Sequence, residues 1–506
     1  MPSSPKLRLP ALSIELLWPL IILAAFAFYT ALVPQPPNDL WWHLKIGEYV
    51  YAQKTIPTTN LFAWTLPTDQ PFYYAAWLGE WLLYVLYRLG GIDLTLFVRN
   101  LLTLATFGLL AWEMRQRSGS WRISALTLTL ASLMCMTVPL VRTQMWCWLP
   151  FLLFLILLRR YTRGEIHGAW LLALVGLMIF WVNVHGTFIM GLLLVGAYFT
   201  GEAMRTLLRQ PQALPGRKVA WLGAIGLLVA ISTLVNPRTS EIFGYLSNLM
   251  TDQPVQQLVD EWKSPTPLGL ANTTFYISIL ALIAVLAISR FRPRPTDTLL
   301  VAGFLWLAWD GQRSILWYAL AVMPILAEAV SQLPITVKAL PAPRSLVNTL
   351  AAALLFVPFI LVQPWLVESF PLPPAYWEQV HQGAPEGRML SSDTPIAAVQ
   401  YLQEHPGGNL FNEMGFGSYL IWAVPEQGVF VDTRIELYPY SLWADYIRIS
   451  QGVRYNALLE QYGANRILLH TGLQQGLAEQ LPSDPIWTLE YADTYTQIWC
   501  KAAACP

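Results

Sequence analysis

The sequence predicts a mainly α-helical, polytopic membrane protein with about eleven transmembrane helices, an amphipathic first outer loop and a C-terminal α/β extracytoplasmic domain. Three observations predict this fold class. Of 506 residues, 55% are apolar and only 12% are charged, which excludes an ordinary water-soluble globular protein. Apolar runs recur as far as residue 365. Beyond that point the chain has the pattern of short strands and helices.

The first apolar run, residues 12–33, is long enough to cross a hydrocarbon core of about 30 Å and lacks the cleavage site of a secretory signal. We therefore expect a retained span. Later runs predict the other spans, several of them short: 94–112, 123–139, 146–158, 169–181, 188–203, 219–235, 274–288, 298–309, 315–329 and 346–365. The predicted transmembrane domain covers residues 1–366.

The basic residues predict the orientation of these spans. Clusters such as 115–122, 159–163 and 290–294 follow alternate spans, whereas the connections on the other side hold few cations. The positive-inside rule then places the N-terminus in the cytoplasm. The alternation holds only if residues 77–89 do not cross, so this stretch is predicted to be a surface helix within a first outer loop, residues 33–93.

The last part of the chain, residues 367–506, is predicted to form an α/β domain outside the membrane. Residues 428–432 and 466–470 are apolar runs of strand length, and Thr394-Pro395 is typical of the start of a helix that would continue to Gln403. Cys500 and Cys505 would pair in an oxidising compartment or stay free in a loose tail, and the sequence leaves both readings open.

Charge and cysteine content exclude several kinds of function. Lys+Arg and Asp+Glu are 31 each, so the formal net charge is zero and no long basic tract favours nucleic acid as a partner. The four cysteines lack the paired spacing of a zinc or iron–sulfur site.

Ionisable residues gather at the predicted outer ends of the spans. A charge within apolar sequence is energetically costly unless it forms an ion pair or serves a function. The predicted inner connections show only basic flanks. The outer residues are Asp39, His43, Glu80, Arg142, His185, Arg238, Glu261, Asp310 and Arg313. A functional site is therefore expected on the outer side.

The segment 36–43 gives the clearest local pattern. Its two prolines stop the first span, Asn38 can cap a helix, and Asp39 falls in the first turn, where the helix dipole favours an ionised carboxylate. Asp39 and His43 are four residues apart and share one face. This arrangement suits a base or a metal ligand. Alternatively, Asp39 only stabilises its own helix while His43 reaches water.

The other candidates also have structural alternatives. Glu80 would lie on a solvated face of the surface helix, and His185 would be a buried histidine that hydrogen-bonds a turn. Arginines such as Arg142, Arg238 and Arg313 suit a lipid-linked phosphate, because guanidinium groups bind phosphate by bidentate hydrogen bonds.

The longer motifs show a family resemblance. They are Asn38-Asp39-Leu-Trp-Trp-His43-Leu-x-x-Gly47, Trp77-Leu-Gly-Glu80, Gly90-Gly91, Trp181-Val-Asn183-x-His185-Gly186, Glu261-Trp262 and Val431-Asp432-x-Arg434. Together they resemble a bacterial branch of the C-type (GT-C) glycosyltransferase superfamily, polytopic enzymes that use polyprenyl-phosphate or polyprenyl-diphosphate sugars. The resemblance covers most of the chain.

The resemblance implies a glycosyltransferase that moves a hexose or pentose from a polyprenyl-phosphate donor to an acceptor hydroxyl on the outer face, with inversion. In many members the first-loop acid is the catalytic base, or a metal ligand in the oligosaccharyl-transfer branch, and that role falls on Asp39. His43 and Glu80 would assist it. The candidates to bind the donor phosphate are Arg142, His185, Arg238 and Arg313.

This chain also departs from the pattern of the family. The loop has no Asp-Asp or Glu-Asp pair, and we find no Trp-Trp-Asp motif, so neither transfer to peptide asparagine nor a strong dependence on metal is expected, and a divalent metal stays an unsupported alternative. No metal ligand and no cofactor beyond the lipid-linked co-substrate is predicted.

The predicted partners are membrane lipid, the lipid-linked donor and an unidentified acceptor, at a bacterial-type plasma membrane that faces the cell envelope. Two alternatives remain: a non-catalytic GT-C-like structural subunit of a membrane complex, and a lipid-linked sugar transporter. Polar residues at one face rather than at midspan favour the enzyme over the transporter.

Overall fold

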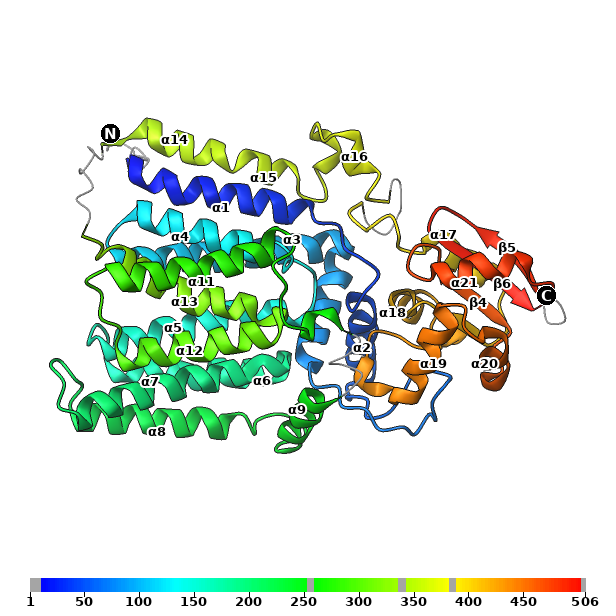
Figure 1. The fold of residues 1–506 in the computed structure, drawn as a ribbon, viewed down its shortest axis with the longest axis horizontal. Helices are drawn as coiled ribbons and strands as arrows, with labels where there is room; N and C mark the ends of the chain where they lie inside the picture. Colours follow the sequence, from blue (N-terminus) through cyan, green and yellow to red (C-terminus); the bar gives the residue numbers. More distant parts are fainter. Residues whose placement is uncertain (1–10, 253–258, 335–342, 382–387, 502–506) are drawn as a thin grey trace, which may run out of the picture.

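A computed structural model describes residues 11–252, 259–334, 343–381 and 388–501. Most of the chain forms a bundle of helices that run side by side, and the C-terminal unit lies at one end of this bundle (Figure 1). The bundle helices are α1 (Ile14–Leu32), α3 (Trp77–Ser118), α4 (Trp121–Met134), α5 (Trp148–Thr162), α6 (Ala173–Val184), α7 (Ile189–Leu207), α8 (Gly216–Ser232), α11 (Leu270–Ile288), α12 (Pro295–Asp310), α13 (Ile315–Val330), α14 (Leu346–Leu355) and α15 (Val357–Leu361).

Apolar helices make this a multi-pass membrane protein, as predicted. Six helical segments are long and apolar enough to cross a membrane: Ile14–Leu32, Trp77–Ser118, Thr143–Thr162, Gly186–Leu207, Leu270–Ile288 and Gln312–Val330. The predicted number of about eleven spans is not confirmed, because segments such as Trp121–Met134 and Gly168–Val184 are shorter. The orientation of the chain in the membrane stays a prediction.

Helix α3 is two helices joined at a bend. Gly90 and Gly91 have non-helical backbone angles, and Gly91 has φ +65°, a conformation that favours glycine. Helix α2 (Leu40–Gln53) lies across the end of the bundle and packs against α3 (Figure 1). A Cβ at Gly47 of α2 would lie 2.2 Å from the Glu80 carbonyl oxygen, so glycine allows this close approach. The predicted break between the surface helix and the second span is confirmed.

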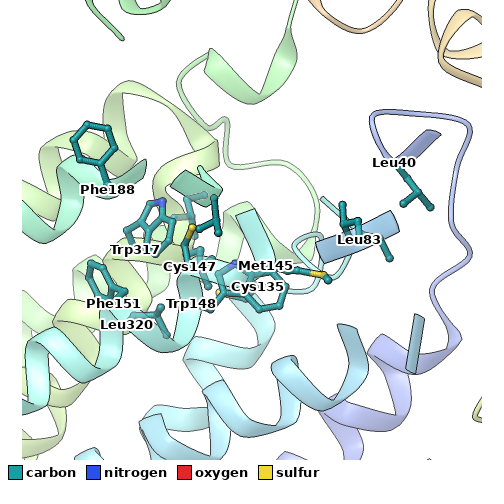
Figure 2. Packing of buried hydrophobic residues seen from close by; sticks show 14 of the residues in the cluster. Leu40, Leu83, Cys135, Met145, Cys147, Trp148, Phe151, Phe188, Trp317 and Leu320 are labelled. Atoms are coloured by element: carbon teal, nitrogen blue, oxygen red, sulfur yellow. The ribbon is translucent and has the colours of Figure 1, made fainter. Parts of the chain in front are cut away.

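The centre of the bundle is a cluster of aromatic and aliphatic side chains around α13, which is buried along almost its whole length. Phe151 packs against Trp317 with ring centroids 5.1 Å apart, and against the edge of Phe304 at 5.4 Å. Figure 2 shows Phe151 and Trp317 in this cluster, with Leu83 of α3 and Leu40 of α2 to one side of them. Close packing of these side chains holds the helix ends that carry the polar residues described below.

The C-terminal unit contains a small mixed sheet in the order β3-β4-β6-β5, in which β3 and β4 are parallel and the other pairs antiparallel. Its strands and main helices are β3 (Leu410–Asn412), β4 (Arg466–His470), β5 (Trp487–Ala492), β6 (Thr496–Lys501), α17 (Ile396–Glu404), α18 (Met414–Ala423), α19 (Tyr440–Ser450), α20 (Tyr455–Tyr462) and α21 (Gln475–Gln480). The strand at 466–470 is confirmed, and the predicted helix is α17. Cys505 lies outside the described residues, and the domain boundary at 366 stays a prediction.

The predicted strand at 428–432 is wrong. The amide of Val429 donates to the carbonyl of Phe62 at 2.9 Å, and its carbonyl accepts from the amide of Trp64 at 3.1 Å. These residues form an isolated bridge to the first loop rather than a strand of the sheet. The apolar pattern of this segment therefore reflects burial between the first loop and the C-terminal unit.

The prediction of simple basic flanks at the other end of the bundle is also wrong. The Glu113 carboxylate lies 3.1 Å from Nε of Arg117 and 2.6 Å from Nε of Arg159, and these side chains are almost fully buried. Nη1 of Arg117 also lies 3.5 Å from Asp297 and 3.6 Å from Glu328. We call these five residues the far-end network. The three carboxylates of this network compensate the charges of Arg117 and Arg159, which the sequence predicted to lie in loops.

Candidate functional site

Most of the predicted site residues meet at the α2 end of the bundle, next to the C-terminal unit. They come from separate segments, because Asp39 precedes α2 and Glu80 lies before the bend of α3. Arg142 precedes η1 (Thr143–Cys147), His185 lies between α6 and η3 (Gly186–Phe188), and Arg313 lies in η5 (Gln312–Ser314). The site is therefore built from connections that the bundle brings together.

Asp39 is the N-cap residue of α2, but its carboxylate makes no capping hydrogen bond. Its Oδ2 instead lies 3.1 Å from Nε of Arg142, an ion pair without the alignment of a hydrogen bond. The prediction that Asn38 caps the helix and Asp39 falls in its first turn is wrong by one position, because α2 begins at Leu40 and Asp39 is its N-cap residue. The side chain of Asn38 does not cap the helix; its Oδ1 accepts from Nε2 of Gln35 at 2.9 Å. The carboxylate of Asp39 thus faces other segments.

The surroundings of Asp39 favour its ionised form. Burial opposes ionisation, but the nearby guanidinium of Arg142, the His43 ring and the polar groups of Thr433 and Trp42 outweigh it, so the pKa of the Asp39 carboxyl lies below its ordinary value. The side chain remains 24% exposed. A hydroxyl-bearing molecule can therefore reach a carboxylate that is ionised at neutral pH.

His43 and Glu80 form a buried pair beside Asp39. Nδ1 of His43 lies 3.0 Å from Oε1 of Glu80, and the Glu80 side chain is only 1% exposed. The Trp42 ring covers the imidazole, with ring centroids 3.7 Å apart. Oε2 of Glu80 has no hydrogen-bond partner in the part of the chain that the structure describes. The pair fixes the orientation of the His43 ring on the face that it shares with Asp39.

Arg142 lies between two carboxylates. Both oxygens of Glu261 lie 2.7 Å from its Nη1, while Asp39 contacts Nε. The Glu261 side chain is 44% exposed, and that of Arg142 is 27% exposed. In the sequence, Glu261 was only one of several outer acids. Its contact with Arg142 arises from packing between segments more than 100 residues apart, which local spacing does not reveal.

Arg313 lies over the Trp262 ring, with its guanidinium carbon 4.2 Å from the ring centroid. Such a cation–π contact holds the group in place without forming a direct ion pair. Among the described residues, no carboxylate lies within salt-bridge distance of Arg313, and Asp310 is exposed. Arg313 is accordingly the cation best placed to accept an anion from outside.

His185 is neutral in this site. Burial and, next, the charge of Arg313 lower the pKa of His185 to about 3. The amide of Thr187 donates to its Nδ1 at 3.1 Å, which places the ring proton on Nε2. His185 can thus offer an N–H to a phosphate oxygen, but no positive charge.

Arg238 lies at the rim rather than in the cluster. Its Nε contacts Glu241 at 2.9 Å, and its guanidinium lies 4.9 Å from the centroid of the Tyr73 ring. The Arg238 side chain is 38% exposed. The structure does not bring this candidate into contact with Asp39.

The C-terminal unit completes the site with residues that local sequence patterns did not single out. The Thr433 hydroxyl hydrogen-bonds Asp39 and also Oγ of Ser418, at 2.8 Å. The hydroxyl of Tyr245, in α9 (Glu241–Thr251), donates to Oε1 of Glu436 at 3.1 Å. Burial raises the pKa of Glu436. The contacts of Asp39 with Thr433 and of Tyr245 with Glu436 link segments almost 200 or more residues apart, so only the folded chain reveals them.

A buried ion pair anchors this part of the C-terminal unit. Nη2 of Arg434 lies 2.6 Å from Oδ2 of Asp432, and Nη1 donates to the Tyr74 hydroxyl at 3.1 Å. Tyr438 donates to the same carboxylate. The motif Asp432-x-Arg434 therefore joins the first loop to the segment that presents Thr433 and Glu436.

A groove of about 530 Å³ lies between α6, the start of α3 and the segment that follows α8. Nε1 of Trp77 donates to Oδ1 of Asn183 at 2.8 Å at the groove. Side chains that line the groove include Trp77, Leu78, Ile179, Phe180, Asn183 and Asn236. Within the described ranges, no group of three His, Cys, Asp or Glu residues is arranged to hold a metal ion.

No family model and no curated protein matches this sequence. Two structures of the oligosaccharyltransferase from Archaeoglobus fulgidus have a similar fold. The AglB complex with an inhibitory peptide and a dolichol-phosphate has a TM-score of 0.54 at 10% identity, covering 97% of this chain and 75% of that chain. The apo form has a TM-score of 0.52 at 9% identity, covering 97% and 74%.

A third similar structure is ArnT from Cupriavidus metallidurans in the apo state, with a TM-score of 0.44 at 14% identity, covering 96% of this chain and 97% of that chain. The fold that the resemblance implied is confirmed by the two oligosaccharyltransferase structures, because this chain shares their fold over almost its whole length.

Proposed function

We propose that this protein is a membrane glycosyltransferase that moves a sugar from a polyprenyl-phosphate donor to an acceptor hydroxyl, with inversion. The observation that carries the proposal is the partly exposed Asp39 carboxylate, 3.1 Å from Arg142 and close to Arg313, which has no direct ion pair among the described residues. The fold similarity to AglB, which was solved with a dolichol-phosphate, supports a lipid-linked donor.

Asp39 is the proposed base. Its carboxylate takes the proton of the acceptor hydroxyl while the acceptor oxygen attacks the anomeric carbon of the sugar. The bond between that carbon and the phosphate oxygen breaks on the opposite face, and its electron pair leaves with the polyprenyl phosphate. The His43–Glu80 pair assists by fixing the polar surface beside Asp39.

Arg313, Arg142 and the Nε2–H of His185 are proposed to bind the donor phosphate. Negative charge develops on the phosphate as the glycosidic bond breaks, and preorganised cations and N–H donors stabilise that charge. Arg238 is assigned a weaker role, in attracting the phosphate from the rim, because its partner Glu241 already compensates its charge.

The groove at Trp77 and Phe180 suits the apolar tail of the donor, since its walls are largely apolar and it opens at the helix ends. By the positive-inside rule, the α2 end faces the outside of a bacterial-type plasma membrane. Residues 1–366 would then form the transmembrane domain and residues 367–506 the extracytoplasmic domain, where Thr433 and Glu436 meet the acceptor.

The test is a transfer assay with purified protein, a panel of polyprenyl-phosphate-linked hexoses and pentoses, and candidate acceptors. Asp39→Asn should lower transfer by at least about 100-fold, because it removes a positioned base. Asp69→Asn, in the same loop but exposed, should transfer as the wild type does. Full transfer by Asp39→Asn would refute the assignment of the base.

One observation favours a second candidate, a non-catalytic structural subunit. Asp39 and Glu261 together compensate Arg142, as in a purely structural contact. If the wild-type protein transferred no sugar from any donor of the panel and bound no lipid phosphate, this second function would replace the first.

A further inference from the structure

The Arg142 guanidinium already holds an anionic group, the carboxylate of Glu261. We infer that Glu261 is an internal competitor for the donor phosphate: its two oxygens occupy the position on Arg142 that two phosphate oxygens would take. This inference rests on the proposed function and adds a residue that sets the affinity of the site for lipid phosphates.

The contact occupies a nitrogen of Arg142 that a phosphate oxygen would also use. Both carboxylate oxygens of Glu261 lie 2.7 Å from Nη1 of Arg142, the distance of a charge-assisted hydrogen bond. Arg313 interacts electrostatically with Glu261 and with Arg142. A phosphate placed between the two guanidinium groups would therefore meet the same cations as the Glu261 carboxylate does.

The charge balance of the site requires that the donor phosphate replace one of the carboxylates. Without donor, the cations Arg142 and Arg313 face the carboxylates Asp39 and Glu261. A polyprenyl-phosphate sugar is a phosphodiester and brings one more negative charge. Asp39 must remain close to take the acceptor proton, so Glu261 is the carboxylate that gives way. After transfer the leaving phosphate gains charge, and Glu261 competes with it again for Arg142, which favours product release.

Hydrogen bonds from Gln312 hold the backbone on both sides of Glu261, so this segment does not depend on the Glu261 carboxylate. The amide of Gln312 donates to the carbonyl of Lys263 at 3.0 Å, and Nε2 of Gln312 donates to the carbonyl of Asp260 at 2.6 Å. A Cβ at Gly311 would lie 3.3 Å from the Trp262 carbonyl oxygen, which shows how closely the two segments pack. Since Glu261 is also 44% exposed, its neutral amide variant should fold normally.

The experiment measures binding of geranyl phosphate to the purified full-length protein in detergent by isothermal titration calorimetry. Glu261→Gln should lower the Kd about five- to tenfold, because it removes a partly exposed competing ion pair. Glu368→Gln, which breaks an exposed arginine–glutamate pair away from the site, should stay within about twofold of wild type. The increase in affinity should be absent from the double variant Glu261→Gln/Arg142→Gln, which lacks both members of the ion pair.

Two further ligands identify the chemistry that is recognised. If Glu261→Gln binds inorganic phosphate more tightly by the same factor, the competition is supported and the site recognises the anion alone. If the affinity increases only for geranyl phosphate, the competition is also supported and the lipid contributes to recognition. A gain for geraniol, which has no phosphate, would overturn the inference. An unchanged or higher Kd of Glu261→Gln for geranyl phosphate would also overturn it.

The failure of this inference is distinct from that of the proposed function. If the wild type transfers sugar and Glu261→Gln binds geranyl phosphate no more tightly, only the competitor is refuted. If Asp39→Asn keeps full transfer while Glu261→Gln binds more tightly, the base assignment fails and the competitor stands.

Discussion

Both ends of the bundle contain arginine–glutamate ion pairs, but the pairs differ in how far they are exposed to solvent. In the far-end network, Glu113 is fully buried between Arg117 and Arg159, whose side chains are 1% and 4% exposed. At the α2 end, the side chains of Arg142 and Glu261 are 27% and 44% exposed. Burial, rather than residue type, therefore distinguishes charges that hold helices together from charges that can exchange partners.

The physical basis of this contrast is the cost of an unpaired charge. In a dry interior, removal of one partner leaves the other without compensation, so the contact cannot open. At a partly exposed site, water or a ligand can replace the partner at little cost. The far-end network is therefore structural, whereas the two partly exposed pairs of Arg142 at the α2 end are suited to binding.

The largest effect is expected at the far end. Glu113→Ala should destabilise the protein by about 3–5 kcal/mol, because Arg117 and Arg159 lose a buried partner. Thermal unfolding of the detergent-solubilised protein measures this change. Glu165→Ala, which removes a 39% exposed partner of Arg159, should change stability by less than about 1 kcal/mol. Equal effects of the two variants would contradict the structural role of burial.

A smaller loss is expected at the α2 end, and in binding rather than in stability. Arg313→Gln should raise KM for the donor roughly 10- to 100-fold, since a charge-assisted hydrogen bond contributes about 1.5–3 kcal/mol. Its thermal midpoint should stay close to that of wild type. Lys263→Gln, a nearby exposed cation, serves as the control. A normal KM in Arg313→Gln would remove Arg313 from the phosphate site.

The pH profile offers a sharper test of the pairing between Asp39 and Arg142. The base acts when ionised, so kcat/KM falls as the pH drops through the pKa of Asp39. Burial raises this pKa, and Arg142 is the first of the groups that lower it. Arg142→Gln should consequently move the acidic limb to higher pH, whereas Arg142→Lys, which keeps the charge, should move it less. An unmoved limb in Arg142→Gln would show that another group titrates.

The smallest effect is expected at the rim. Arg238→Gln should change donor KM by less than about twofold, because its ion pair with Glu241 is exposed and lies outside the cluster. A loss comparable to that of Arg313→Gln would show that Arg238 enters the site when the donor binds.

The sequence predicts the helices and the position of the site better than it predicts the partners within the site. Apolar runs of sufficient length specify helices, and Gly90-Gly91 specifies the break in α3, because these signals are local. The clustering of polar residues at one end follows from alternate crossings. Contacts such as Arg142 with Glu261, or Asp39 with Thr433, depend on how distant segments pack, which no local pattern encodes.

The failed predictions have the same cause. Glu113 and Arg117 are four residues apart on one helix face, a spacing that favours an ion pair, but the nearby arginines suggested a solvated flank. Helix α3 continues to Ser118, so this pair is buried against α5 and α12. Residues 428–432 have the composition of a strand, yet their backbone partners come from the first loop.

The most direct test of the account is a cryo-electron microscopy structure of the full-length protein with geranyl phosphate at saturating concentration. We predict phosphate density within hydrogen-bond distance of Arg313 and Arg142, with the Glu261 carboxylate displaced from Nη1 and Asp39 still facing the ligand. An Arg142–Glu261 contact unchanged from that described above, with phosphate density absent from the α2 end, would contradict the account.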